Sequence, residues 1–351
     1  MKIFPRSVPR SVLGLAAAGF CLWGAGVPAH AADTTVLRMA DSLPNGSFIY
    51  KLVAKPFMDE VEKRTDGKVT FKYFPSQQLG KAKDMLKLTQ TGMADIGYVG
   101  PGYIQDKMPL SQVFELPGAF SDDSCQGFTA FWDMTHDGGY LQVNEWDPNG
   151  VIPILSLITR HHIYISNSKP INTLDDLKGL KLRSSGGAMA STMQEMGLVP
   201  VNISAPETYE SMQRGTVDGA FYPAQSAFDY GLTDLIKSGT TSRHVAGVVL
   251  TYAISKDAWN KLDPETQQII LDVGREISTT SCRGFDAAEQ DAIERMSAQG
   301  IKKIHFDEAD GKRIDEAFER SSQAWAKSLD ERGKPGSDTL AAMRKAVAAV
   351  Q

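Results

Sequence analysis

One long helical pattern near the end of the chain narrows the folds that this sequence can adopt. Asp263 and Pro264 suit the N-cap and the first turn of a helix. From there, apolar or small side chains recur with helical spacing until Gly300, at positions 270, 273, 277, 281, 284, 288, 292 and 296. At 1.5 Å per residue such a helix is ~54 Å long. Because one lobe does not need a helix of that length, we expect it to run along two lobes.

Strand patterns alternate with helical patterns along most of the chain, which predicts an α/β fold. In the first half we expect strands at 36–40, 69–74, 95–99 and 151–157, and helices at 48–64, 81–90 and 125–134. In the second half we expect strands at 162–166, 199–203, 217–222, 245–254 and 304–306, a strand ending at Arg183, and helices at 188–196, 206–214 and from 311 onward. The chain is expected to cross between lobes near residue 157.

A short internal repeat supports two similar lobes. Gln90–Tyr98 (QTGMADIGY) and Gln213–Phe221 (QRGTVDGAF) carry Gln, Gly and Asp in register, each where a helix leads into a strand. The match is short, so coincidence stays open as an explanation. Taken as real, it predicts a first lobe of residues 32–157 and 246–283 and a second lobe of residues 158–245 and 284–351. We expect a ligand cleft between them.

The first residues have the pattern of a secretory signal peptide. Lys2, Arg6 and Arg10 precede an apolar run and an Ala-x-Ala site, so we predict cleavage after residue 31. Without these three cations the chain has 34 basic and 42 acidic residues, a net charge of −8. An acidic balance disfavours nucleic acid as a partner. Export permits a disulfide between Cys125 and Cys282, but the sequence alone leaves their pairing open.

Arg183 is the leading candidate for a binding residue. It ends a short apolar strand, and the Ser/Gly loop that follows it opens a helix near Ala188. A guanidinium beside the free N–H groups of a helix start offers donors to a carboxylate or a phosphate. An ion pair with a neighbouring acid is the alternative. We include Ser185, in the same loop, as a further candidate.

Other candidates lie near the expected crossover and at strand ends. Arg160 or His162 could face the cleft with Arg183, or could belong to a solvated loop. Aromatic side chains at strand ends, namely Tyr98, Phe221 and Tyr222, are candidates for the cleft walls, although core packing explains them equally well. We add Gln225, which follows them in the sequence, as a further candidate.

Signatures of catalysis are mostly missing from the sequence. The S-x-x-K match at Ser166 needs its serine at a helix start, whereas Pro170 biases Lys169 toward extended backbone. His161 and His162 are adjacent on a strand and so point to opposite faces, which disfavours a shared metal. We therefore expect neither an enzyme nor a cofactor or metal site, and keep a secreted hydrolase as a remote alternative.

Several motifs together resemble one family of transport proteins. They are the turn Phe74-Pro75-x-x-Gln78-Leu79-Gly80, then Asn167–Ile171 (NSKPI), Leu177–Arg183 (LKGLKLR) and Pro206–Gly219 (PETYESMQRGTVDG). In order and spacing they resemble the DctP-type substrate-binding proteins of TRAP (tripartite ATP-independent periplasmic) transporters. The resemblance implies a two-lobe, periplasmic-binding-protein-like fold that closes on a small organic acid and delivers it to a sodium-driven membrane permease.

The resemblance also implies roles for particular residues. Arg183 would grip the ligand carboxylate, and Arg160 and His162 would compete for the place of a second basic residue. Tyr222 stands where the family commonly has Asn. This favours a monocarboxylate with an apolar or aromatic part over a simple C4-dicarboxylate or sialic acid. We also keep a 2-oxo or 2-hydroxy acid as a candidate ligand. We expect a periplasmic monomer; the alternative from another class is a sensor module that reports to a membrane kinase.

Overall fold

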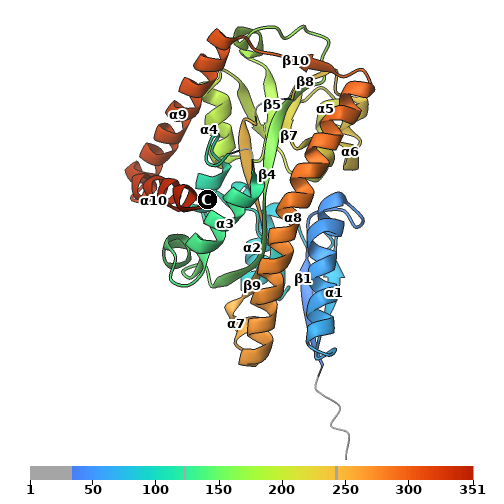
Figure 1. Cartoon of the computed structure of the whole chain (residues 1–351), viewed down its shortest axis with the longest axis vertical. Coiled ribbons are helices and arrows are strands. Elements are labelled where there is room, and N and C mark those ends of the chain that lie inside the picture. The colour runs from blue at the N-terminus through green and yellow to red at the C-terminus, as the bar shows by residue number, and fades with distance from the viewer. Residues whose placement is uncertain (1–33, 122, 242–243, 351) are drawn as a thin grey trace, which may run out of the picture. The chain divides into compact units, whose positions relative to one another are not determined.

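The computed structural model describes residues 34–121, 123–241 and 244–350 (Figure 1). The predicted signal peptide, residues 1–31, lies outside the described residues and stays a prediction. The strands are β1 (Thr35–Ala40), β2 (Val69–Phe74), β3 (Ile96–Tyr98), β4 (Val151–Ile165), β5 (Lys181–Ser184), β6 (Val199–Asn202), β7 (Gly219–Tyr222), β8 (Ser238–Thr240), β9 (Ala246–Ser255) and β10 (Lys302–Ile304). The α-helices are α1 (Lys55–Arg64), α2 (Met85–Gln90), α3 (Ser124–Thr135), α4 (Gly187–Glu195), α5 (Thr208–Gln213), α6 (Ala224–Asp229), α7 (Lys256–Trp259), α8 (Pro264–Ala298), α9 (Glu308–Glu331) and α10 (Gly336–Ala349).

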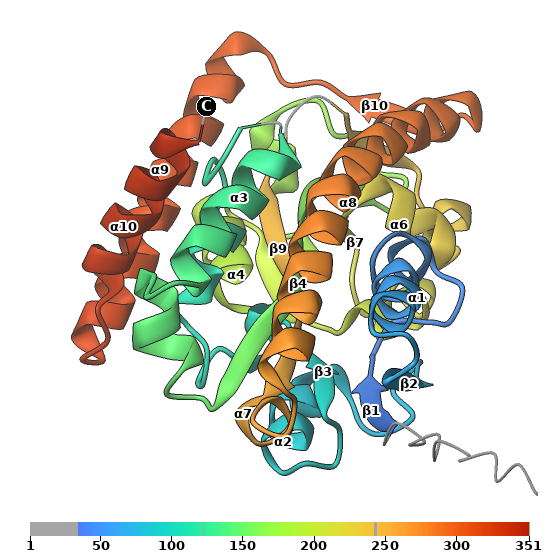
Figure 2. The ribbon, with the colours of Figure 1, turned by 60° about the horizontal axis from the view of Figure 1, so that its bottom comes forward.

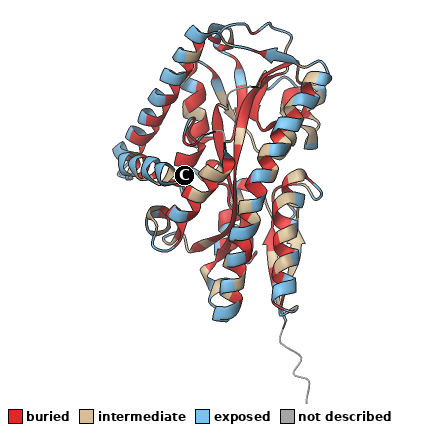
Figure 3. Ribbon diagram, in the orientation of Figure 1, coloured by how far each residue is buried: buried red, intermediate tan, exposed pale blue. Residues whose placement is uncertain are grey.

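The strands are ordered β2-β1-β3-β9-β4-β7-β5-β6, with β8 beside β4 and β10 beside β8. The neighbours of β1 and of β5 are parallel to them, as expected for two α/β lobes. Between the lobes, β4 and β9 pair antiparallel with each other and with the strands that flank them. Both faces of the sheet are covered by helices, and the strands form the buried interior (Figure 3).

The strand β4 corrects one prediction. We expected two strands with a crossover loop near residue 157, but β4 runs without interruption from Val151 to Ile165. It pairs with β9 up to His161 and with β7 from His162. The polar residues 160–162 were therefore wrongly interpreted as a loop candidate. They lie inside a strand because their backbone pairs with β9 and β7, and the side chain of Arg160 bonds to Asp286 of α8.

The long helix is confirmed. It is α8, a helix of 35 residues, which corresponds to ~52 Å. Asp263 caps it through the N–H of Thr266. It contacts α1, α3, β4 and α6. In Figure 2 it runs from α7 across β4 toward β10.

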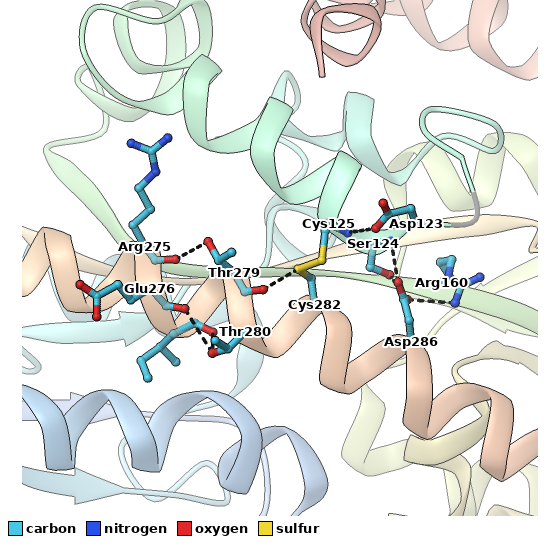
Figure 4. Close-up of a disulfide and its surroundings, with 11 residues drawn as sticks. Asp123, Ser124, Cys125, Arg160, Arg275, Glu276, Thr279, Thr280, Cys282 and Asp286 are labelled. Atoms are coloured by element: carbon cyan, nitrogen blue, oxygen red, sulfur yellow. Dashed lines mark hydrogen bonds and ion pairs between the residues drawn. A yellow bond between two sulfur atoms is a disulfide. The ribbon is translucent and has the colours of Figure 1, made fainter. Parts of the chain in front are cut away.

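A disulfide joins α8 to α3. Cys125 and Cys282 are bonded, with their Cα atoms 5.0 Å apart (Figure 4). Near the bridge, Asp286 of α8 accepts hydrogen bonds from the main-chain N–H and the hydroxyl of Ser124, at 3.0 and 2.6 Å. The pairing that the sequence left open is thus formed between residues separated by 157 positions.

The internal repeat has a structural counterpart in the two lobes. Asp95 accepts a hydrogen bond from the main-chain N–H of Arg38 on β1 at 2.8 Å. Asp218 accepts one from the N–H of Lys181 on β5 at 2.9 Å. In each lobe, the aspartate at the start of one strand thus holds the neighbouring parallel strand. The shared Asp has the same structural task in both halves.

The C-terminal helices divide between the two halves. We expected the helices after Gly311 to return to the second lobe, and α9 does pack against α4. In contrast, α10 packs against α3. Its side chains Leu340 and Met343 share a buried cluster with Phe131 and Trp146. The predicted lobe boundaries remain a prediction.

Candidate ligand-binding pocket

A pocket lies between the lobes, at the place where strands of both lobes end. It has a volume of about 50 Å³. The first lobe contributes the loop after β1, the end of β3 and the 3-10 turn that follows it, and the second contributes the ends of β5 and β7 with α6. Its lining consists of Leu43, Ser47, Ile49, Tyr98, Tyr103, Thr159, His161, Arg183, Ala205, Tyr222, Pro223, Ser226, Asp229, Tyr230, Val248 and Leu250. Ligands of open α/β sheets bind at such carboxyl ends of strands.

Arg183 is the charged group at the centre of this lining, and it is 1% exposed. Its Nε donates to the carbonyl of Ile203 at 2.9 Å and its Nη1 to the carbonyl of Phe221 at 3.3 Å. Its Nη2 donates to the hydroxyl of Tyr103, across the cleft, at 3.2 Å. These neutral acceptors fix the guanidinium in place without balancing its charge.

No carboxylate among the described residues forms a salt bridge with Arg183. The charge of Arg183 lowers the pKa of Glu115, but burial has the larger effect and raises the pKa of that carboxyl to about 8. At neutral pH Glu115 is therefore mostly protonated. The alternative of an ion pair with a neighbouring acid is therefore not realised there. A buried cation without a counter-ion is unfavourable unless an anion joins it.

Glycines bring the loop after Arg183 close to the first lobe. Gly186 has φ 107° and Gly187 has φ 48°, both in the left-handed region. A Cβ on Gly186 would lie 2.8 Å from the carbonyl oxygen of Gly102, and one on Gly187 would lie 1.6 Å from Oε1 of Gln112. Any other side chain would push the two lobes apart at this point.

Tyrosines form much of the pocket wall. The rings of Tyr98 and Tyr252 lie 5.7 Å apart, and Tyr222 packs edge-on against Tyr230 at 5.9 Å. The guanidinium of Arg183 lies 5.2 Å from the centroid of the Tyr222 ring. Burial raises the pKa of Tyr98 and Tyr222, so both hydroxyls stay protonated. The wall is apolar with hydrogen-bonding hydroxyls.

A buried aspartate fixes the first loop of the pocket. Asp41 accepts hydrogen bonds from the hydroxyls of Tyr252 and Tyr73, at 2.5 and 2.8 Å, and from the main-chain N–H of Leu43 at 2.8 Å. Burial raises its pKa. The network orients the loop that presents Leu43 to the pocket.

His161 also lines the pocket, and the sequence reasoning missed it in favour of its neighbours. It is 3% exposed, and its ring N–H donates to the carbonyl of Phe221. Burial, together with the charge of Arg183, holds its pKa well below the usual value, so it is neutral. Alternation along a strand was the available signal, because Thr159 and His161 share the face that looks into the pocket.

Residues 39–328 match the family model for bacterial extracellular solute-binding proteins, family 7, known as DctP. The chain belongs to this family. It is 27% identical, over 84% of its length and 86% of the other protein, to the C4-dicarboxylate-binding periplasmic protein DctP of Rhodobacter capsulatus. It is 25% identical, over 88% and 93%, to the sialic acid-binding periplasmic protein SiaP of Vibrio cholerae. The predicted family is thereby confirmed.

Solved structures confirm the two-lobe fold. A TRAP periplasmic solute-binding protein from Bordetella bronchiseptica, with bound mandelate, superposes with a TM-score of 0.79 at 24% identity, over 90% of this chain and all of that one. One from Rhodoferax ferrireducens, in complex with benzoate, superposes with a TM-score of 0.81 at 22% identity, over 90% and 98%. This DctP protein therefore shares the two-lobe architecture of these TRAP solute-binding proteins.

Of the candidate residues in this DctP protein, Arg183, Tyr98 and Tyr222 line the pocket with their side chains. The side chain of Phe221 lies in the core, and only its carbonyl reaches Arg183 and His161. Ser185 packs on Met189, 3.6 Å from its sulfur. These placements leave ligand contact itself as a proposal.

The other candidates point away from the pocket. Nη2 of Arg160 donates to Asp286 of α8 at 2.9 Å (Figure 4). His162 lies on the same strand face as Tyr164, with ring centroids 6.4 Å apart. Oε1 of Gln225 accepts from Arg295 at 2.5 Å on the outer side of α6.

Neither a cluster of metal ligands nor a membrane-spanning helix occurs among the described residues. Nowhere in the described ranges do three or more His, Cys, Asp or Glu side chains gather as metal ligands would. Among the helices of the same residues, none combines the length and the apolar character of a membrane span.

Proposed function

We propose that this DctP protein captures a small organic monocarboxylate in the pocket between its lobes, with Arg183 binding the carboxylate, and delivers it in the periplasm to the permease of a TRAP transporter. The observation that carries the proposal is the buried guanidinium of Arg183. It faces a pocket built by both lobes, and no described acid forms a salt bridge with it. An anionic ligand would supply the missing counter-charge.

The charges of the lining favour one carboxylate over two. Arg183 is the single Arg or Lys among the described residues of the lining, and Asp229 adds a negative charge at the rim. A second carboxylate on the ligand would find no cation and would be repelled by Asp229. One relative is named for C4-dicarboxylate and another for sialic acid. Because their names differ in the acid, the number of carboxylates on the ligand of this chain is inferred from its own side chains.

Arg183 alone is too weak to explain useful affinity. A hydrogen bond to a charged group contributes about 1.5–3 kcal/mol net, whereas micromolar binding requires about −8.2 kcal/mol. Burial of an apolar ligand body between Tyr98, Tyr222 and the aliphatic lining would supply the rest. Because a benzene-sized ligand needs a cavity of about 150 Å³, the lobes must move apart to admit an aromatic acid into the pocket of about 50 Å³.

Calorimetric titration of refolded, ligand-stripped protein tests the proposal. The panel contains aliphatic and aromatic monocarboxylates, 2-oxo and 2-hydroxy acids, and dicarboxylates. We expect one class of monocarboxylate to bind, and Arg183→Gln to weaken its binding at least about 100-fold because a charge-assisted pair is lost. Arg160→Gln is the matched control, since that arginine pairs with Asp286, and should leave affinity unchanged. Full affinity in Arg183→Gln would refute the proposal.

The alternatives from other classes have less support. The nucleophile of the remote hydrolase alternative, Ser166, donates instead to the carbonyl of Asp218 at 2.9 Å, and Lys169 Nζ donates to the carbonyl of Asp176 at 2.8 Å. The serine and lysine of that motif thus bond to different parts of the chain. A sensor role would be indicated by affinity capture of a membrane kinase in place of the permease.

A further inference from the structure

The pocket contains an imidazole whose hydrogen-bonding capacity is half used. His161 lies on β4, is nearly completely buried and lines the pocket beside Arg183. The carbonyl of Phe221 acts on the ring as a backbone hydrogen-bond acceptor and raises its pKa, against the larger effect of burial. Among the described residues, Nδ1 has no hydrogen-bond partner. Buried nitrogen atoms are normally paired, so an unpaired one in a binding pocket indicates a group that arrives with the ligand.

The partner of Nδ1 must be a donor. Burial and the neighbouring charge of Arg183 keep the ring neutral, and a neutral imidazole carries one N–H. That hydrogen is used on the Phe221 carbonyl, which assigns it to Nε2. Nδ1 therefore carries an unpaired lone pair on a side chain that lines the pocket, and a ligand hydroxyl or amine could donate to it.

The position of this lone pair relative to Arg183 decides where the donor must sit. Nη1 of Arg183 donates to the same Phe221 carbonyl at 3.3 Å. The centroid of the Tyr222 ring lies 5.2 Å from the guanidinium and 6.2 Å from the centroid of the His161 ring, so both side chains border the same small pocket. A ligand whose carboxylate binds Arg183 therefore brings the atoms next to that carboxylate within reach of His161.

We propose that Nδ1 of His161 accepts a hydrogen bond from a hydroxyl on the carbon next to the ligand carboxylate, so that the pocket selects 2-hydroxy acids. The inference rests on the proposed function, because it requires the carboxylate at Arg183. The 2-oxo oxygen of a 2-oxo acid is an acceptor without a hydrogen, so its lone pairs would be repelled by the lone pair of Nδ1. An acid without a 2-substituent would leave Nδ1 unpaired. Of these three kinds of acid, only the hydroxy acid donates to Nδ1.

Three acids of one carbon skeleton test this selection: mandelate, phenylglyoxylate and phenylacetate, which carry a hydroxyl, an oxo group and no substituent at that carbon. Lactate, pyruvate and propionate form the equivalent aliphatic series. In calorimetry with the mature protein, we expect one enantiomer of a hydroxy acid to bind about tenfold or more tightly than both analogues of its series. Equal affinities, or tighter binding of the oxo acid, would overturn the inference.

Variants locate the selection at His161. His161→Phe has an aromatic ring but no acceptor, so the preference for the hydroxy acid over its unsubstituted analogue should fall to about one. His161→Asn can present an amide oxygen near the place of Nδ1 and should restore part of the preference. His162→Phe, on the opposite strand face, is the matched control and should keep the wild-type ratio. An unchanged ratio in folded His161→Phe would refute the role of this residue.

The outcomes separate this inference from the proposed function. If acids bind through Arg183 but without a hydroxy preference, the role of His161 is wrong and the receptor proposal stands. If no acid of either series binds, or Arg183→Gln has no effect, the proposed function itself fails. Should both His161 variants fail to fold, the order of the three acids on the wild-type protein still decides.

Discussion

The disulfide between α3 and α8 should be a large contributor to stability. Cys125 and Cys282 close a loop across a sequence separation of 157. The chain-entropy relation gives a restriction of about 17 cal/mol/K for such a loop, or roughly 5 kcal/mol at 25 °C, as an upper limit. Unfolding of about 320 residues carries an entropy near 0.67 kcal/mol/K, so this corresponds to a melting point lower by roughly 7 °C.

The test compares the wild type with the double variant Cys125→Ser, Cys282→Ser by calorimetry, each with and without a thiol reductant. Reduction should lower the melting point of the wild type toward that of the double variant and leave the double variant unchanged. The pair of bonds from Ser124 to Asp286 remains after reduction, so α3 should stay on α8 and the ligand affinity should change less than about twofold. A melting point that differs by less than about 1 °C would refute the reasoning.

Three other perturbations have outcomes that the structure determines. Glu289 accepts hydrogen bonds from the N–H groups of Ala224 and Gln225, and burial raises its pKa to about 7. Because the folded state holds this proton more tightly than the unfolded chain, Glu289 should lower the stability by up to ~3 kcal/mol as pH rises from about 4 to 7. In denaturant titrations, the fall in stability over this pH range should be smaller by that amount in Glu289→Gln. Asp229→Asn removes the rim carboxylate, which accepts a hydrogen bond from the N–H of Phe48 at 2.8 Å. Because this carboxylate would repel a second carboxylate on the ligand, titration should show dicarboxylates gaining several-fold in affinity relative to monocarboxylates. An unchanged ratio of the two affinities would contradict this. Gly187→Ala forces a Cβ onto Gln112 and should cost about 1–3 kcal/mol of unfolding free energy, measured with urea.

Local patterns were sufficient for much of the fold. The periodicity after Pro264 predicted α8 because every turn of that helix presents a side chain to the sheet or to a packed helix. The strand that ends at Arg183 was predicted from its apolar run and from the Gly-rich helix start. The repeated Asp could be seen in the sequence because both lobes use it for the same hydrogen bond.

Long-range partners explain what the sequence did not predict. Arg160 looked suited to a loop or a cleft, but its partner Asp286 lies 126 residues away. The two cysteines are still further apart in sequence. Adjacent residues of a strand point to opposite faces, so one of His161 and His162 faces the cleft whichever face of the strand that is. The sequence does not show that residue 160 faces α8, and so it could not favour His161 over His162.

The place where β4 changes partners connects the fold to the recognition of the ligand. The strand leaves β9 after His161 and joins β7 at His162, while α8 also contacts helices of both lobes. Opening of the pocket must therefore bend these continuous elements, since none of them can slide freely past the others. The atoms nearest such a bend move least. We therefore expect Thr159 and His161 to hold their positions during opening, while Tyr103 separates from Arg183 and Phe48 from Asp229. In such a site, fixed groups on β4 select the ligand and mobile groups enclose it. His161→Phe should therefore change which acid is bound more than it changes the closing of the lobes.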